Sequence, residues 1–443
     1  MPETLDFVHG LYAEFFERGV RYFFPNATLR ATASTSAITP SLTFLNRTDG
    51  TLDLEWMGIR YHLERPGRPF TENQVRLLGA IGGVLSARYR SIFFAPSAAS
   101  GANLFAGLPE DRYVSAFLEH LPYLDETGLP TERDIVGDAI EVLRESSLLT
   151  YENRRISTGV LLTTAAAETR APAFPQEALP YNNLLVAIKS FHRLCDGLHT
   201  VFLVDREGKL GDLVDIEQFS RPEQGKLLPA PSSARYRPHS LATLHGGNIC
   251  LVLTPNGEIK IFAAGAQVFH FLEGRWHLTD VAEKYHEFHQ ALGNAALAER
   301  LFTVALNLAE ARRGGLFVLL GDRRAAASLV APGDLLAHPA PGGPEAESAK
   351  AQLHYLLRGK SARELDLRVL ESVARVDGGI VMDREGALLA FGAILRSGGE
   401  PLAAQEGGRT TAAVHASRFG LALKISEDGL VSFYRSGERL WEI

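Results

Sequence analysis

Apolar residues recur along most of the chain at the spacing of a helix face or of a strand. The clearest helical series lies in residues 70–93, where the apolar positions are Val75, Leu78, Ile81 and Leu85. Thr71 precedes Gln74 by three residues, the spacing of a capping box, so we expect a helix to begin there. Residues 35–64 alternate instead, which predicts strands joined by a hairpin turn at Asp49-Gly50.

Loop-prone segments divide the pattern into four parts. We expect a small α+β domain over residues 1–94 and a helical linker over 95–145. Two α/β modules follow, the first over 146–294 and the second over 295–443. At 443 residues the chain is too long for one hydrophobic core, so several domains are expected.

Two further segments are rich in Pro, Gly, Ser and Ala, at residues 220–238 and 331–349. Such composition predicts loops, and we expect both to lie on the surface. The strand-rich N-terminal part closed by a helix resembles the C-terminal half of a GAF sensory domain, although it shows no GAF ligand motif. A small N-terminal sensory-type domain is therefore expected.

The second half of the chain contains a repeat. The stretches "CDGLHTVFLVDREGKLGDLVDI" (195–216) and "VDGGIVMDREGALLAFGAIL" (376–395) share an Asp-Gly turn, an apolar run, the residues Asp-Arg-Glu-Gly and another apolar run. Hairpin signals follow each copy, at Asn256-Gly257 and Asp428-Gly429. Any two hairpin units look somewhat alike, but the agreement in order favours a duplication.

Composition and charge narrow the function classes. Hydrophobic residues at 46% and charged residues at 22% are typical of a globular protein. The net charge of −7 argues against general nucleic-acid binding or an anionic membrane surface. No apolar run is long enough to span a membrane and the first residues are acidic, so we expect a cytoplasmic protein. Cys195 and Cys250 fit neither a disulfide framework nor a zinc site.

The last third of the chain resembles the diadenylate cyclase domain of DisA-type proteins, which joins two ATP molecules into cyclic di-AMP. The order of pieces carries the resemblance: "AEARRGGLFVLLGD" (309–322), "ELDLRVLESVARVDGGIVMD" (364–383) and "EGGRTTAAVHASRFGLALKISEDGLVSFYRSG" (406–437). It implies an α/β (α+β) fold with a mixed sheet flanked by helices, here preceded by a related module. This chain is similar to the sensor versions called DACN-type, which carry an extra N-terminal portion before the cyclase-like core; the earlier copy of the repeat would be that portion.

The resemblance also implies site residues. The D-G-A turn of the family stands here as Asp377-Gly378-Gly379, and the Ser-Glu pair as Ser426-Glu427. The G-T-R-H-R loop stands as Gly407, Gly408, Arg409, Thr410 and Thr411. One arginine therefore remains, while the His, the second Arg and the preceding Thr are replaced.

These replacements favour binding over catalysis. Joining two nucleotides requires a metal held by carboxylates and cationic donors for the leaving pyrophosphate. Threonine offers only a neutral hydroxyl where arginine makes charge-assisted bonds. We therefore expect a sensor that binds a purine nucleotide or cyclic dinucleotide through Asp377, Arg409, Thr410 and Thr411, and that signals to a partner or to its own N-terminal domain.

Two alternatives stay open. An active diadenylate cyclase would use Asp377 on Mg²⁺ or Mn²⁺ and Arg409 on phosphate, and would act as a homodimer because the family chemistry needs two domains face to face. A purely structural module is favoured if Arg409 is buried in a salt bridge. Outside the motif, Arg312 and Arg313 could reach an anion, whereas Asp196 in the earlier copy is expected to be structural because no Gly-Gly-Arg loop follows it.

Overall fold

The computed structural model describes residues 2–34, 39–65, 68–93, 105, 107–118, 134–163, 178–188, 190–245, 247–336, 351–396 and 407–443. It forms two compact units: Met1–Gln224 with Ala242–Leu278, and Gly225–Leu241 with Thr279–Ile443. Much of the expected linker and most of the expected loop at 331–349 lie outside the described residues. The domain boundaries expected from the sequence stay predictions.

The elements of unit 1 are helices and three antiparallel or mixed sheets. Its helices are α1 (Pro2–Phe23), α2 (Glu72–Phe93), α3 (Pro109–Leu118), α4 (Ile135–Ser147), α5 (Phe191–Leu194) and α6 (Ile216–Ser220). Its strands are β1 (Thr28–Ser34), β2 (Thr43–Thr48), β3 (Thr51–Trp56), β4 (Ile59–Glu64), β5 (Thr150–Tyr151), β6 (Arg154–Arg155), β7 (Thr158–Leu162), β8 (Thr200–Val204), β9 (Leu210–Asp215), β10 (Ile249–Leu253), β11 (Ile259–Ala263), β12 (Ala266–Leu272) and β13 (Arg275–Leu278).

Unit 2 holds the remaining elements. Its helices are α8 (Val281–Leu292), α9 (Ala295–Glu310), α10 (Ala326–Leu329), α11 (Leu367–Ala374) and α12 (Gly408–Ala416). Its strands are β14 (Gly315–Leu320), β15 (Gly379–Asp383), β16 (Leu388–Ala393), β17 (Gly420–Ile425), β18 (Val431–Arg435) and β19 (Glu438–Glu442). Helix α7 (Arg237–Ala242) lies where the chain passes between the units. Helices and mixed sheets together confirm the expected α/β (α+β) class.

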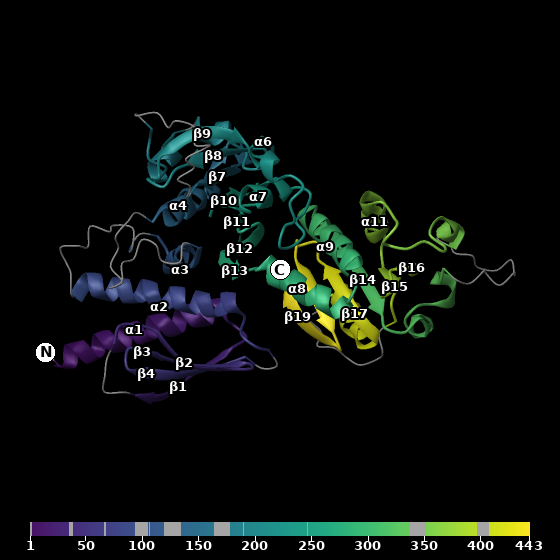
Figure 1. Ribbon diagram of the computed structural model, residues 1–443, viewed down its shortest axis with the longest axis horizontal. Coiled ribbons are helices and arrows are strands. Elements are labelled where there is room, and N and C mark those ends of the chain that lie inside the picture. The colour runs from purple at the N-terminus through teal and green to yellow at the C-terminus, as the bar shows by residue number, and fades with distance from the viewer. Residues whose placement is uncertain are drawn as a thin grey trace. The chain divides into compact units, whose positions relative to one another are not determined.

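The N-terminal part of unit 1 confirms the expected hairpin and helix start. A four-stranded sheet in the order β1-β4-β3-β2 packs with α1 and α2, which lie side by side (Figure 1). Gly50 turns β2 into β3 with a φ of +87°. At the start of α2 the Thr71 amide donates to the Gln74 Oε1 at 3.1 Å, and the Gln74 amide donates to the Thr71 Oγ1 at 3.2 Å. These reciprocal bonds are a capping box.

A buried ionic network joins α3 to α4. Arg112, only 1% exposed, donates from Nη1 to the Asp134 Oδ2 at 2.8 Å. The other Asp134 oxygen accepts from the Gly137 amide at 2.7 Å and from the Ser115 hydroxyl, so this carboxylate also caps α4. Desolvation of such a pair is offset only while every partner is present.

The seven-stranded sheet of unit 1 and the six-stranded sheet of unit 2 share a strand order. The first runs β13-β12-β11-β10-β7-β8-β9, and the second runs β19-β18-β17-β14-β15-β16 when read in the same sense. In each sheet one central pair is parallel, β7 with β8 and β14 with β15, and the neighbouring pairs are antiparallel. The first sheet adds β13 at its edge.

The repeated Asp-Arg-Glu-Gly turns adopt the same hydrogen bonds in both sheets. The amide of Lys209 donates to the Asp205 Oδ1 at 2.7 Å between β8 and β9, and the amide of Ala387 donates to the Asp383 Oδ1 at 2.9 Å between β15 and β16. Both turns are closed by a glycine amide bonded to the aspartate carbonyl. Asp205 and Asp383 therefore shape hairpins.

Helices cover both faces of the unit 2 sheet. Leu308 of α9 and Leu370 of α11 share one core with Phe317 of β14. Ala413 of α12 shares a separate core with Val318, which points to the opposite face of the same strand. The sheet is therefore the middle layer of three.

The segment 225–241, hereafter the arm, corrects one expectation from the sequence. A surface loop was expected over 220–238, but Ala230 and Tyr236 are buried, and Ala230 belongs to the core of unit 2. The composition of the arm is typical of a loop and Leu227 is exposed, yet Ala230 packs into a core formed by residues distant in sequence. Among the described residues no helix has the length and apolarity to cross a membrane.

The buried network of α3 and α4 gives a stability prediction. Asp134→Ala removes the Nη1 partner of the buried Arg112 guanidinium, which keeps Glu141, at 3.4 Å, and the charge of Asp138. We expect the free energy of unfolding of unit 1 to fall by about 3–5 kcal/mol. Arg21→Ala, which removes an exposed pair with Glu17, should cost less than about 1 kcal/mol. Chemical denaturation followed by fluorescence measures both, and equal losses would contradict the assignment.

Candidate functional site

The parallel pairing of β14 with β15 sets the position of the candidate site in unit 2. Parallel strands begin at the same edge of a sheet, so Gly314, before β14, and Asp377, before β15, lie at one edge. Strand β17 is antiparallel to β14 and ends at this edge, at Ile425. Three loops distant in sequence therefore meet there.

The Asp377-Gly378 turn is held by close backbone packing. Gly378 has a φ of +106°, and a Cβ on it would lie 2.4 Å from the carbonyl carbon of Gly392 in β16. Only glycine fits this approach. The turn therefore projects the Asp377 carboxylate outward, where its side chain is fully exposed.

Arg409 is the residue on which the loops converge. Its Nη1 donates to the Glu427 Oε1 at 2.8 Å, and its Nη2 lies 3.8 Å from the Asp377 Oδ1. The guanidinium also lies directly against Gly314, where a Cβ would stand 2.1 Å from Nη1. The Arg409 side chain is 36% exposed, so this ion pair is partly open to solvent rather than buried.

A second cation lies beside the first turn of α12. Lys424 of β17 donates from Nζ to the Thr410 Oγ1 at 2.9 Å. Helix α12 begins after Gly407 without a side-chain cap. Its first amides, from Gly408 onward, lie at the positive end of the helix dipole and suit an anion.

Three of the remaining motif residues do not contact the Arg409 guanidinium among the described interactions. Thr411 lies half-buried on the first turn of α12, and Gly379 begins β15 in the core. The Ser426 hydroxyl donates to the Asp428 Oδ2 at 3.0 Å, within the hairpin turn. The structure therefore brings together Asp377, Arg409, Thr410 and Glu427, while Ser426 shapes the turn that presents Glu427.

Two residues of this cluster were missed by the sequence reasoning. Lys424 is the one charged residue in the strand sequence "GLALKI", which is the signal that could have marked it. In the sequence, Gly314 indicates only the connection between a helix and the strand that follows it. Nearby, Arg312 lies against Gly429, where a Cβ would stand 2.9 Å from its guanidinium, so it supports the hairpin next to the site.

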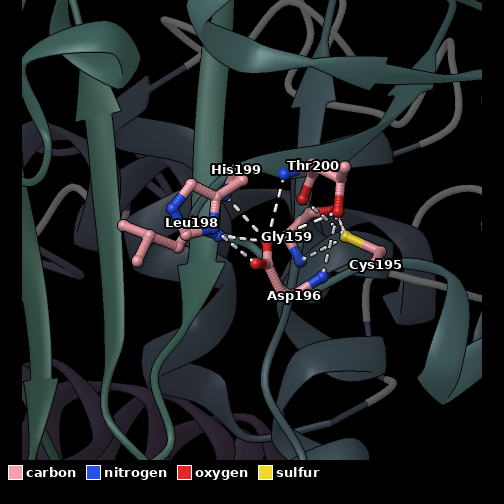
Figure 2. Close-up of polar contacts among 6 residues, drawn as sticks. All are labelled: Gly159, Cys195, Asp196, Leu198, His199 and Thr200. Carbon is pink, nitrogen blue, oxygen red and sulfur yellow. Dashed lines mark hydrogen bonds and ion pairs between the residues drawn. The ribbon is translucent and has the colours of Figure 1, made fainter.

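The equivalent loop of unit 1 holds its aspartate differently. Figure 2 shows the Asp196 carboxylate turned back onto its own loop. Its Oδ1 accepts from the amides of Leu198, His199 and Thr200 at 2.8–3.0 Å, and its Oδ2 lies 2.7 Å from the His199 Nδ1. Burial opposes ionisation, but these donors outweigh it and lower the pKa of Asp196 to about 2.

A buried thiol completes the unit 1 loop. The Cys195 Sγ accepts from the Gly159 amide at 3.2 Å and donates to the Thr200 carbonyl at 2.9 Å (Figure 2). Burial raises the pKa of Cys195, which keeps the thiol protonated as a donor. Asp196 therefore has a structural role, as expected, whereas Asp377, at the matching position of unit 2, makes no hydrogen bond to its own loop among the described residues.

The donor set for a metal at the site is small. Among the described residues, no group of three or more His, Cys, Asp and Glu side chains gathers as a metal site. Asp377 and Glu427 are the two carboxylates on either side of Arg409. Two carboxylates fit Mg²⁺ or Mn²⁺ in the mode where phosphates and waters supply the other ligands.

Comparison with known proteins gives partial likenesses to solved structures, among them the two described below. No family model matches the chain, and no curated protein does. A hypothetical membrane spanning protein from Bacillus cereus is 18% identical, over 36% of this chain and 78% of that one, with a TM-score of 0.24. A double-cysteine mutant of DacA from Staphylococcus aureus is 17% identical, over 35% of this chain and 87% of that one, with a TM-score of 0.20. Similarity of this size assigns neither family nor function.

The Asp196 loop predicts a change in acid stability. Because the folded pKa lies below the ordinary value of 3.8, the ionised carboxylate stabilises the fold above about pH 4, and this contribution is lost as the pH falls through about 2. We expect Asp196→Asn to cost on the order of 1 kcal/mol at pH 7, a value reduced for solvent screening. Thermal unfolding across pH should show the two proteins converging as the pH falls from about 4 to about 2; a constant difference would contradict the assignment.

Proposed function

We propose that unit 2 binds a purine nucleotide or cyclic dinucleotide and serves as a sensor of it. The observation that carries the proposal is the convergence of Asp377 and Arg409 at the uncapped start of α12. The resemblance of the last third of the chain to the diadenylate cyclase domain supplies the ligand class.

The phosphate half of such a ligand fits the start of α12. Arg409 and Lys424 supply two cations, and the first helix amides supply neutral donors. Thr410 accepts from Lys424, which leaves its own hydroxyl proton for a phosphate oxygen. To reach a phosphate, Arg409 exchanges one carboxylate partner for another anion.

The ribose half fits Asp377. An exposed carboxylate accepts hydrogen bonds from vicinal hydroxyls, as acidic residues do for ribose in dinucleotide-binding folds. The 3.8 Å between Asp377 and Arg409 places this acceptor next to the proposed phosphate donors. A nucleotide carries both groups within one small moiety.

Binding without turnover follows from the composition of the loop. A cyclase must stabilise negative charge on the leaving pyrophosphate, and removing one such donor typically costs about 10²- to 10³-fold in rate. In this loop Thr410 and Thr411 stand where the resemblance places His and Arg. The second candidate, an active cyclase, is favoured by Asp377 and Glu427, which are the residues that would hold Mg²⁺ or Mn²⁺ and so supply Lewis-acid assistance.

Calorimetry with ATP and with cyclic di-AMP tests the proposal on the purified full-length chain. We expect at least one of them to bind, and Arg409→Ala to weaken that binding by about tenfold or more, because a charge-assisted contact is lost. Incubation with ATP and Mn²⁺ should give no cyclic product.

Two outcomes would overturn this reading. Cyclic product that disappears in Asp377→Asn would make the protein an enzyme, and the sensor proposal would fail. Absence of binding by both ligands would refute the nucleotide site itself and favour a structural role for the Arg409 ion pairs.

A glycine substitution tests the position of Arg409 without removing it. In Gly314→Ala the new Cβ occupies the place of the guanidinium, which must leave Glu427. Because Arg409 ends in a flexible side chain, we expect little change in melting temperature but about tenfold weaker nucleotide binding. Gly321→Ala at the other end of β14, where the nearest atom is 3.7 Å away, is the matched control and should bind normally. Equal affinities in both variants would contradict the geometry.

A further inference from the structure

The arm, residues 225–241, makes an unusual excursion. The chain leaves unit 1 after Gln224, contributes the arm to unit 2, and returns to unit 1 at Ala242. Ala230 lies in the core of unit 2 with α9. Burial, and next the charge of Glu310 at the end of α9, raise the pKa of Tyr236, which places this tyrosine close to the same helix.

One side chain of α9 holds both the arm and α11. The Asn307 Oδ1 accepts from the amide of Ala234 in the arm at 2.7 Å. The Asn307 Nδ2 donates to the Glu371 Oε1 of α11 at 2.6 Å. A backbone amide can only donate and a carboxylate can only accept, so the orientation of the Asn307 amide group is fixed by its two partners.

Both helices joined by Asn307 run directly into the loops of the candidate site. Helix α9 ends at Glu310, and four residues later Gly314 lies against the Arg409 guanidinium. Helix α11 ends at Ala374, and three residues later comes Asp377. A change in the arm therefore has a short, packed route to both charged groups of the site.

We propose that Asn307 is a positioning residue that couples the arm to the Asp377 and Arg409 loops. Through Asn307 the packing of the arm and the order of the site loops are linked. A bound ligand should therefore hold the arm more firmly against unit 2, and displacement of the arm should lower the affinity of the site. Such coupling is reciprocal. The effect on ligand affinity rests on the proposed function, whereas the coupling between arm and loops does not.

A double-mutant cycle separates coupling from general damage. Asn307→Asp keeps the acceptor for the Ala234 amide but sets a carboxylate against Glu371. Glu371→Gln alone keeps a carbonyl acceptor and should behave as wild type. In the Asn307→Asp/Glu371→Gln double variant the donor and acceptor exchange places, which restores the bond.

Hydrogen exchange by mass spectrometry on the full chain gives a readout that needs no ligand. We expect Asn307→Asp to speed exchange by about fivefold in the arm and also in residues 375–380 and 407–412. The double variant should return all three segments to wild-type exchange. Calorimetry with ATP and cyclic di-AMP should show about fivefold weaker binding in Asn307→Asp, restored in the double variant.

The contrary results are distinct. Faster exchange confined to the arm, or failure of the double variant to restore the two site loops, would overturn the coupling. If the wild-type chain binds neither nucleotide, the proposed function fails, and the exchange cycle still decides whether Asn307 couples the arm to the loops.

Discussion

The parallel pairing of β14 with β15 is the constraint on which the candidate site depends. It forces the connections before the two strands to the same edge of the sheet, and antiparallel β17 delivers its final residues there. Gly314, Asp377 and Glu427 then surround Arg409, although even the nearest of them in sequence, Glu427, lies 18 positions away. The chemistry of the edge is thus a consequence of strand order.

Comparison of the two sheets shows that a shared strand order does not determine what a residue at the matching position does. Both place an Asp-Gly turn before the second strand of the parallel pair. The Asp196 carboxylate accepts hydrogen bonds from three backbone amides of its own loop, so its charge stabilises the turn. Asp377 leaves its oxygens to solvent and to Arg409. The two sheets have the same topology, yet Asp196 stabilises its own loop whereas Asp377 is available to a ligand.

Local structure was readable from the sequence because its causes are local. The capping box at Thr71 and the Gly50 hairpin depend on residues within a few positions of each other. The grouping of Asp377 with Arg409 was inferred from the order of motifs, since spacing alone cannot bring together residues 32 positions apart (377 to 409). Lys424 left one signal in the sequence, a single charge within an apolar strand. The roles of Gly314 and of the arm depend on long-range packing, for which neither periodicity nor composition gives a signal.

The path of the arm bears on how this chain could be divided. Backbone passes between the two units at three places, after residues 224, 241 and 278. A fragment that begins at residue 279 would keep every strand of the second sheet but lose Ala230 and Tyr236, and would open apolar surface where they were seated. The predicted C-terminal module over residues 295–443 is therefore completed by the arm, which comes from the preceding part of the sequence. Transfer of this module into another protein would require transfer of the arm as well.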